Sequence, residues 1–397
     1  MDHKPKSSSR IPTFLLILVF TGVLFFPASA WWNHYQTKRL KEDSNQLLKA
    51  EKWAAAEETA RKWTVRAPDN SDAWLALAEA CRKQNQFAET ADALGRLSDS
   101  DPRILKALAL KTDLLLSELH DPIKTIETCN RMLKIDPKVD LARQRLIYIY
   151  SMMLLRLKMV DQIRQAINLN CEPPEAYVYL LLSDSLNFSN GAPLINSWLQ
   201  NYPDNEDLQV AMAIYIARSS SNQSLRLKDS QLISGGDQSL ISNCLKKYPQ
   251  NREVLAYFLE KSLEEGNLDR VAELFESAPD DVEQDSRFWR FKSRYLALNN
   301  QLDLAEESYR QALKLNPYDW RARLGLAEIL RRKGKVSEAK KMARLGSQGK
   351  AFSKQLKQLE NANSINRELL QEIGQYAHEC GDIAVETAIQ NRLSKSP

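Results

Sequence analysis

Large apolar, small and polar positions recur in a fixed order along most of this chain. Stretches rich in Ala, Leu, Glu, Lys, Gln and Arg, which are good helix formers, each end at a proline. Pro68, Pro102 and Pro137 are separated by 34 and 35 residues. Because a helix tends to stop before a proline, each of these residues marks the end of one helix. The pattern predicts helices of similar length joined by short turns.

The clearest repeating unit runs from Ser286 to Asp319. Its landmarks, at unit positions 4, 11, 20, 24, 27 and 32, are Trp289, Leu296, Ala305, Tyr309, Ala312 and Pro317. The stretch that starts at Ser71 repeats this spacing with Trp74, Leu77, Ala78, Phe87 and Leu94. Small residues at positions 8 and 20 let the two helices of a unit approach closely, and the large residues fill the seam with the next helix.

This spacing resembles the tetratricopeptide repeat, whose pattern is W-x2-L-G-x2-Y, then A-x3-F, then P. The resemblance implies an all-α fold, a right-handed superhelical solenoid of stacked antiparallel helix pairs. We expect about ten pairs over residues 37–395, with weak matches between Asp140 and Asn251 and a loop insertion at 219–237. The expected units begin near Thr37, Ser71, Lys106, Asp140, Glu172, Glu206, Arg252, Ser286, Trp320 and Arg367.

One hydrophobic segment precedes the repeats, after a basic tail over residues 1–10. Residues 11–32 are long enough to cross a membrane as one helix, a signal anchor. The same stretch also reads as a signal peptide cleaved after Ala30. We favour the anchor, because the adjacent Trp31 and Trp32 suit a membrane interface.

Both interpretations place the repeats outside the cytoplasm, and the bacterial periplasm is the expected compartment. The anchor makes the chain a single-pass membrane protein with its N-terminus in the cytoplasm. This layout resembles that of N-terminally anchored bacterial repeat proteins. Cleavage would instead release a secreted or periplasmic protein.

Positive charge gathers late in the chain, although the net charge is only +4. Between Ser286 and Leu345 there are 15 Lys or Arg against 6 Asp or Glu. In the unit from Ser286, Arg287, Arg290 and Arg294 share one helix face by their spacing of i, i+3 and i+7. The modest total charge disfavours nucleic acid as a partner.

In the family's frame this face lines the concave groove, and the next unit adds Arg321, Arg331 and Arg332. Arginine suits bidentate binding of carboxylates. We therefore predict that these six arginines bind an acidic or C-terminal peptide of a partner protein. The competing interpretation is a solvated basic face, partly neutralised by Glu306, Glu307 and Glu328.

Candidate residues for catalysis, a cofactor or a metal do not emerge from the sequence. The four histidines lie far apart, and the five cysteines form no metal-type spacing. We predict a binding protein rather than an enzyme, with no small-molecule substrate and no cofactor. The leading hypothesis is a membrane-tethered protein–protein interaction scaffold that helps to assemble an envelope complex. The alternative is a soluble secreted or periplasmic adaptor that regulates a partner enzyme.

Overall fold

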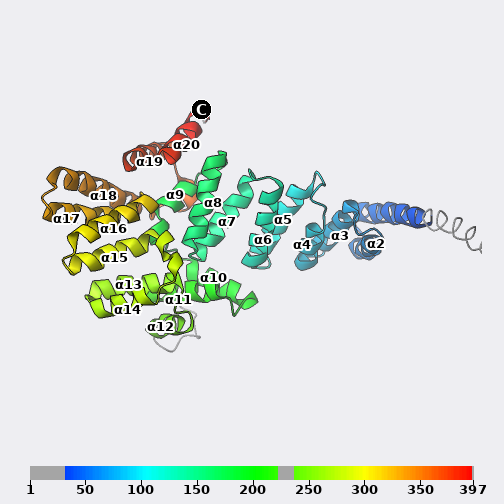
Figure 1. Ribbon diagram of the computed structural model, residues 1–397. Coiled ribbons are helices and arrows are strands. Elements are labelled where there is room, and N and C mark those ends of the chain that lie inside the picture. Colours follow the sequence, from blue (N-terminus) through cyan, green and yellow to red (C-terminus); the bar gives the residue numbers. More distant parts are fainter. Residues whose placement is uncertain (1–31, 222–236, 396–397) are drawn as a thin grey trace, which may run out of the picture. The chain divides into compact units, whose positions relative to one another are not determined.

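The computed structural model describes residues 32–221 and 237–395, and all regular structure within them is helical (Figure 1). This confirms the predicted all-α fold. No helix in these two ranges is long and apolar enough to cross a membrane. The predicted anchor over residues 11–32 lies outside the described residues apart from Trp32. The chain divides into two compact units, residues 1–119 and 120–397.

The first unit is built from short helices that pack against their neighbours in sequence. They are a helix over residues 32–49, α2 (Trp53–Arg66), α3 (Ser71–Lys83), α4 (Phe87–Gly95) and α5 (Ile104–Ser117). The Asn70 side chain caps α3 by accepting hydrogen bonds from the backbone N–H groups of Asp72 and Ala73, at 2.9 and 3.3 Å. Ala60 and Trp63 are buried on α2, so a small and a large side chain share its inner face.

The second unit continues the same design over many more helices. They are α6 (Pro122–Ile135), α7 (Asp140–Met152), α8 (Arg156–Leu169), α9 (Ala176–Leu181), α10 (Gly191–Asn201), α11 (Glu206–Ser221), α12 (Asp237–Lys247), α13 (Arg252–Glu265), α14 (Leu268–Glu276), α15 (Ser286–Leu298), α16 (Leu302–Leu315), α17 (Trp320–Arg332), α18 (Val336–Leu356), α19 (Arg367–Cys380) and α20 (Ile383–Lys395). Three short 3-10 helices connect them: η1 (Ser183–Ser185), η2 (Asp280–Gln284) and η3 (Ala362–Ser364).

Most of the expected repeats begin where a helix begins. This holds for α3, α7, α11, α13, α15, α17 and α19, whose first residues are the predicted starts. The match weakens at α5, which starts two residues before Lys106, and at α9, which starts four residues after Glu172. Residues 219–221 continue α11 rather than opening a loop. The rest of the predicted insertion, up to the start of α12, lies outside the described residues.

The middle of the second unit departs from regular helix pairs. Helix α9 has 6 residues and is followed directly by η1, whereas α18 has 21. A side chain at Gly191, the first residue of α10, would clash with Tyr215, since an added Cβ would lie 2.4 Å from its ring. Glycine therefore permits the close approach of α10 and α11.

The second unit also closes on itself, because helices far apart in sequence pack together. Helix α20 contacts α8, and α18 contacts α9. The Arg164 guanidinium pairs with the Asp382 carboxylate at 2.7 Å, and the Tyr318 hydroxyl donates to the same carboxylate at 3.0 Å. Arg392 donates to the backbone carbonyl oxygen of Glu172. In an open solenoid each repeat contacts only its neighbours, so these contacts set the second unit apart.

Candidate functional site

The arginine face predicted at the start of α15 is largely turned inward. Arg287 and Arg290 are 4% and 8% exposed, whereas Arg294, one turn further on, is exposed. Both buried guanidinium groups bind carboxylates of the same chain. They are therefore not presented to a partner in this structure, which corrects the expectation that all six arginines line one open groove.

Arg287 binds two carboxylates, Glu253 of α13 and Asp285 just before α15. Its Nη2 atom is 2.6 Å from Glu253 Oε1 and 2.5 Å from Asp285 Oδ2. Asp285 also caps α15 by accepting the backbone N–H of Arg287 at 3.0 Å. Burial alone would raise the pKa of Asp285, but the neighbouring Arg287 outweighs burial and lowers it.

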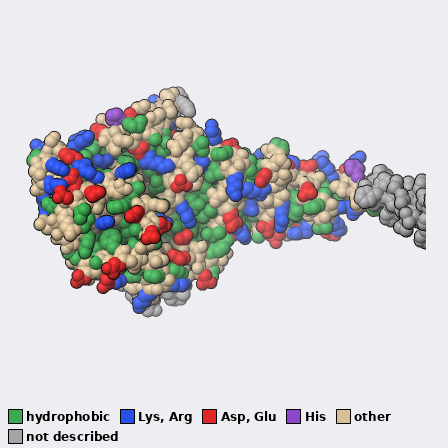
Figure 2. All heavy atoms as spheres, in the orientation of Figure 1, with side chains coloured by type: hydrophobic (Ala, Val, Ile, Leu, Met, Phe, Trp, Pro, Cys, Tyr) green, Lys and Arg blue, Asp and Glu red, His purple; other side chains and the backbone are tan. Residues whose placement is uncertain are grey.

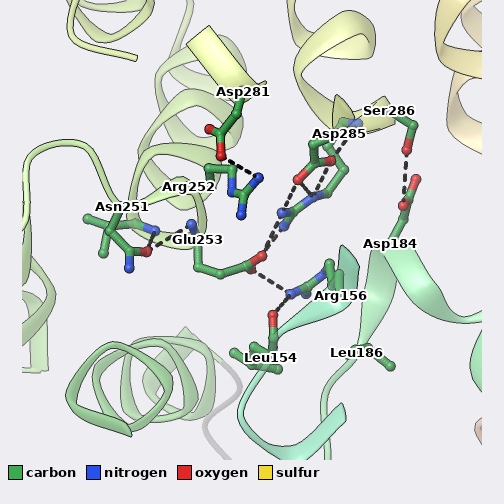
Figure 3. A network of polar contacts seen from close by, with 12 residues as sticks. Leu154, Arg156, Asp184, Leu186, Asn251, Arg252, Glu253, Asp281, Asp285 and Ser286 are labelled. Atoms are coloured by element: carbon green, nitrogen blue, oxygen red, sulfur yellow. Dashed lines mark hydrogen bonds and ion pairs between the residues drawn. The ribbon is translucent and has the colours of Figure 1, made fainter. Parts of the chain in front are cut away.

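Glu253, near the start of α13, is shared by two arginines (Figure 3). It accepts a bond from Arg156 Nη1 at 2.5 Å in addition to the bonds from Arg287. Burial lowers the pKa of Arg156 to about 10, because Glu253 compensates only part of the lost hydration. The Nε and Nη2 atoms of Arg156 are buried and have no hydrogen-bond partner among the described residues. Glu253 thus links Arg156 to Arg287.

Arg290 anchors a second acidic group at the beginning of α17. Its Nε atom donates to Asp319 Oδ2 at 2.7 Å, and Asp319 Oδ1 caps α17 through the backbone N–H of Ala322 at 2.9 Å. Asp184 of η1 lies beside this pair and bonds the Ser286 hydroxyl at 3.4 Å. Burial raises the pKa of Asp184 to about 7, and the nearby Asp319 carboxylate adds to the rise.

The other predicted arginines lie at the surface or near it. Arg321 is partly exposed, with its guanidinium 4.5 Å from the centre of the Trp320 ring. Arg331 pairs with Glu328 on its own helix, and Arg332 donates to the Asn300 side chain at 2.8 Å. Figure 2 shows positive and negative side chains interspersed over α16–α18.

A cleft lies between α9 and the end of α18. It has a volume of about 410 Å³ and is lined largely by apolar and aromatic side chains, among them Tyr148, Tyr179 and Leu356. Its walls come from segments far apart in sequence, so the closure of the second unit creates it. Sequence spacing within single repeats gives no signal for it.

Groups that could hold a metal are absent from the described ranges, where no three His, Cys, Asp or Glu side chains come together. All five cysteines are free thiols. Burial raises the pKa of Cys81 to about 11 and that of Cys129 to about 12, so both stay protonated near neutral pH.

Two stretches of the helical chain match a known repeat. Residues 44–103 and 292–344 match the family model of the tetratricopeptide repeat. These two segments are similar to tetratricopeptide repeats. The second segment runs from within α15 to within α18 and includes Arg294, Arg321, Arg331 and Arg332. No curated protein matches the sequence.

Several solved structures resemble the chain in helical arrangement at low sequence identity. Yeast Tom70 is 14% identical over 97% of this chain and 96% of its own, with a TM-score of 0.29. Pseudomonas aeruginosa PilF is 15% identical over 59% of this chain and 92% of its own, with a TM-score of 0.30. The Cut9–Hcn1 hetero-tetramer is 12% identical over 90% of this chain and 72% of that chain, with a TM-score of 0.32.

Sequence reasoning missed the acidic half of the network. Asp285 and Asp319 each stand one residue before a predicted unit start, where an acidic side chain caps the following helix. That shared position could have pointed to both residues. No comparable feature of the sequence pointed to Arg156 and Glu253, because these two residues are 97 positions apart and lie in different repeats.

Proposed function

We propose that this chain is a protein–protein interaction scaffold that binds peptide or protein partners through its repeat units. The observation that carries the proposal is the match of residues 44–103 and 292–344 to the tetratricopeptide repeat. Stacked helix pairs of this kind present extended surfaces that hold peptides or partner helices.

This proposal includes a membrane tether at residues 11–32, which would place the repeats outside the cytoplasm. One role of such a tethered scaffold is assembly of an envelope complex. The support for the tether is the basic tail, the apolar run and the two tryptophans in the sequence. The alternative is a soluble adaptor of a partner enzyme, released by cleavage after Ala30. N-terminal sequencing of the mature protein separates the two, since a chain that starts at Trp31 would exclude the tether.

We propose that only the exposed arginines of the predicted face contact a partner. Arg294, Arg331 and Arg332 can be replaced without opening the buried network, whereas replacement of Arg287 or Arg290 would leave buried carboxylates unpaired. Loss of a partner in the exposed variants would therefore report on binding rather than on folding. The control is Lys340→Ala, which removes an exposed positive charge on α18.

The direct test is capture with the full chain in detergent, followed by cross-linking and mass spectrometry. We expect a protein that is retained in near-stoichiometric amount and cross-linked to residues of the repeat helices. Retention that is no greater than that of an unrelated membrane protein of similar size would contradict the scaffold proposal.

A further inference from the structure

The cleft between α9 and the end of α18 has the size and lining of a binding pocket. Its volume of about 410 Å³ falls within the usual range for sites that enclose a ligand or an inserted side chain. Val178 of α9 and Leu182, which directly follows α9, line one wall, and Leu356 and Leu359 line the other. Phe188 lies against Tyr179, with ring centres 6.2 Å apart, and gives the cleft an aromatic edge.

A row of lysines leads along α18 to this cleft. Lys350, Lys354 and Lys357 are spaced i, i+4 and i+7, so they share one face of the helix. All three are exposed, and none forms an ion pair within the described part of the chain. Lys357 itself lines the cleft. We call these three residues the α18 lysine row.

More positive charge faces the end of this row. Loss of hydration lowers the pKa of Lys357, and the nearby guanidinium groups of Arg321 and Arg218 lower it further. Arg218 also donates to the backbone carbonyl oxygen of Leu186, a residue of the cleft, at 2.9 Å. Glu360 is the acidic side chain among the lining residues. Cations thus outnumber acids at this edge, in contrast with the matched charges around Glu253.

We infer that the cleft and the α18 lysine row form a docking surface for a partner segment in which acidic residues flank a bulky apolar side chain. The apolar side chain fills the cleft, and the carboxylates pair with the lysine row and Arg321. The inference deepens the proposed scaffold function and rests on it.

The apolar side chain of this partner is inferred from the cleft, and its acidic residues are inferred from the cations beside the cleft. Apolar and aromatic walls reward burial of an apolar side chain. Ammonium and guanidinium groups that lack an acidic partner gain charge-assisted hydrogen bonds when carboxylates approach. A purely acidic segment would leave the cleft empty, and a purely apolar one would leave the cations unpaired.

The test measures binding of labelled synthetic peptides to the full chain in detergent by fluorescence anisotropy. One peptide carries a single Phe between runs of Glu. A second has Ala in place of the Phe, and a third has Lys in place of every Glu. We expect the first to bind at least about tenfold more tightly than either of the others, with affinity that falls as salt rises.

Two variants and one control variant locate the binding. Lys354→Glu combined with Lys357→Glu should weaken the first peptide by about tenfold or more, whereas Lys340→Glu combined with Lys341→Glu, exposed residues earlier on α18, should change it little. Ala362→Trp, which places a large ring at the cleft, should abolish the preference for Phe over Ala. Unchanged thermal unfolding of each variant would show that the fold is intact.

Equal binding of the Phe and Ala peptides would overturn the role of the cleft. If the two double-lysine variants lose peptide affinity equally, the role of the α18 lysine row is overturned. Only a general attraction of acidic chains would then remain. If the Lys354 and Lys357 variant still retains a cross-linked partner of the full chain, the scaffold function stands and this surface is wrong. Absence of any retained partner would instead remove the function on which the surface rests.

Discussion

The two compact units of this chain differ in whether they bury charged side chains. In the first, no Asp, Glu, Lys or Arg among residues 32–119 is buried, and the buried polar groups are hydroxyls such as Thr64 and Thr90. The second buries acids and arginines throughout. They are Asp121, Arg143, Arg156, Glu172, Glu175, Asp285, Arg287, Arg290, Glu306, Asp319, Arg323 and Asp382.

The difference follows from which helices meet. Helices of the first unit pack against their sequence neighbours, where small and large apolar residues suffice. In the second unit, polar contacts also join residues far apart, such as Ser286 to Asp184 and Arg392 to Glu172, separated by 102 and 220 positions. Burial of a charge is unfavourable unless a partner compensates. Matched charges therefore give the closed arrangement a specific register.

The largest expected effect comes from Glu253→Gln. This change leaves Arg156 and Arg287 buried with one shared carboxylate fewer, and loss of one partner from a buried ion pair typically costs about 3–5 kcal/mol. We expect the second unit to lose that much stability while the first unit is unaffected. Hydrogen exchange measured by mass spectrometry follows the two units separately.

Glu264→Gln is the matched control, because Glu264 is an exposed acid on the same helix. It should change the free energy of unfolding by no more than about 0.5 kcal/mol. If Glu253→Gln also changes stability by so little, the network is not what holds the second unit closed.

The second prediction concerns pH and Asp184. Its pKa is raised from 3.8 to about 7, so folded Asp184 holds its proton more tightly than unfolded Asp184. Ionisation therefore opposes folding, and this residue's cost to stability grows as pH rises from about 4 to about 7. The groups that face it are Asp319, Asp285 and the Arg290 guanidinium.

Asp184→Asn keeps a neutral side chain of similar shape at every pH. Its stability should equal that of the wild type near pH 4 and exceed it by about 2–4 kcal/mol above pH 7. Urea unfolding of both proteins over this range measures the difference, in which titrating groups remote from Asp184 cancel. A variant that is less stable than the wild type at high pH would show that Asp184 works as an ionised partner.

The third prediction concerns a feature that the two units share. Ala56 and Ala305 both stand at unit position 20, and both are fully buried where the two helices of a repeat meet. Leucine at either position would force the helices apart and cost about 1–3 kcal/mol. Thermal unfolding and hydrogen exchange should show a similar loss in each unit. A loss confined to one unit would mean that the repeat packing rule does not extend to the other.

The sequence was enough to predict the local helical structure within a single repeat. Residue spacing placed the starts of α3, α15 and α17, because a cap, a small contact residue and a final proline lie close together in the chain. It could not show that Arg287 faces Glu253 rather than an open groove, since that depends on how successive units turn. The charge count near α15 was correct, but the acidic partners of Arg287 lie in the preceding repeat.

The smallest expected effect is in the first unit, at the ion pairs of Asp72 with Lys41 and Arg103. Their side chains are 38–49% exposed, and such pairs contribute about 0–1 kcal/mol each. Hydrogen bonds from Lys41 and Arg103 lower the pKa of Asp72, so any contribution is present above its ordinary pKa and disappears as pH falls. Asp72→Asn should lower the stability of the first unit by no more than about 1 kcal/mol at neutral pH, and high salt should remove even that. A loss as large as that from Glu253→Gln would show that surface charges hold the first unit as firmly as buried ones hold the second.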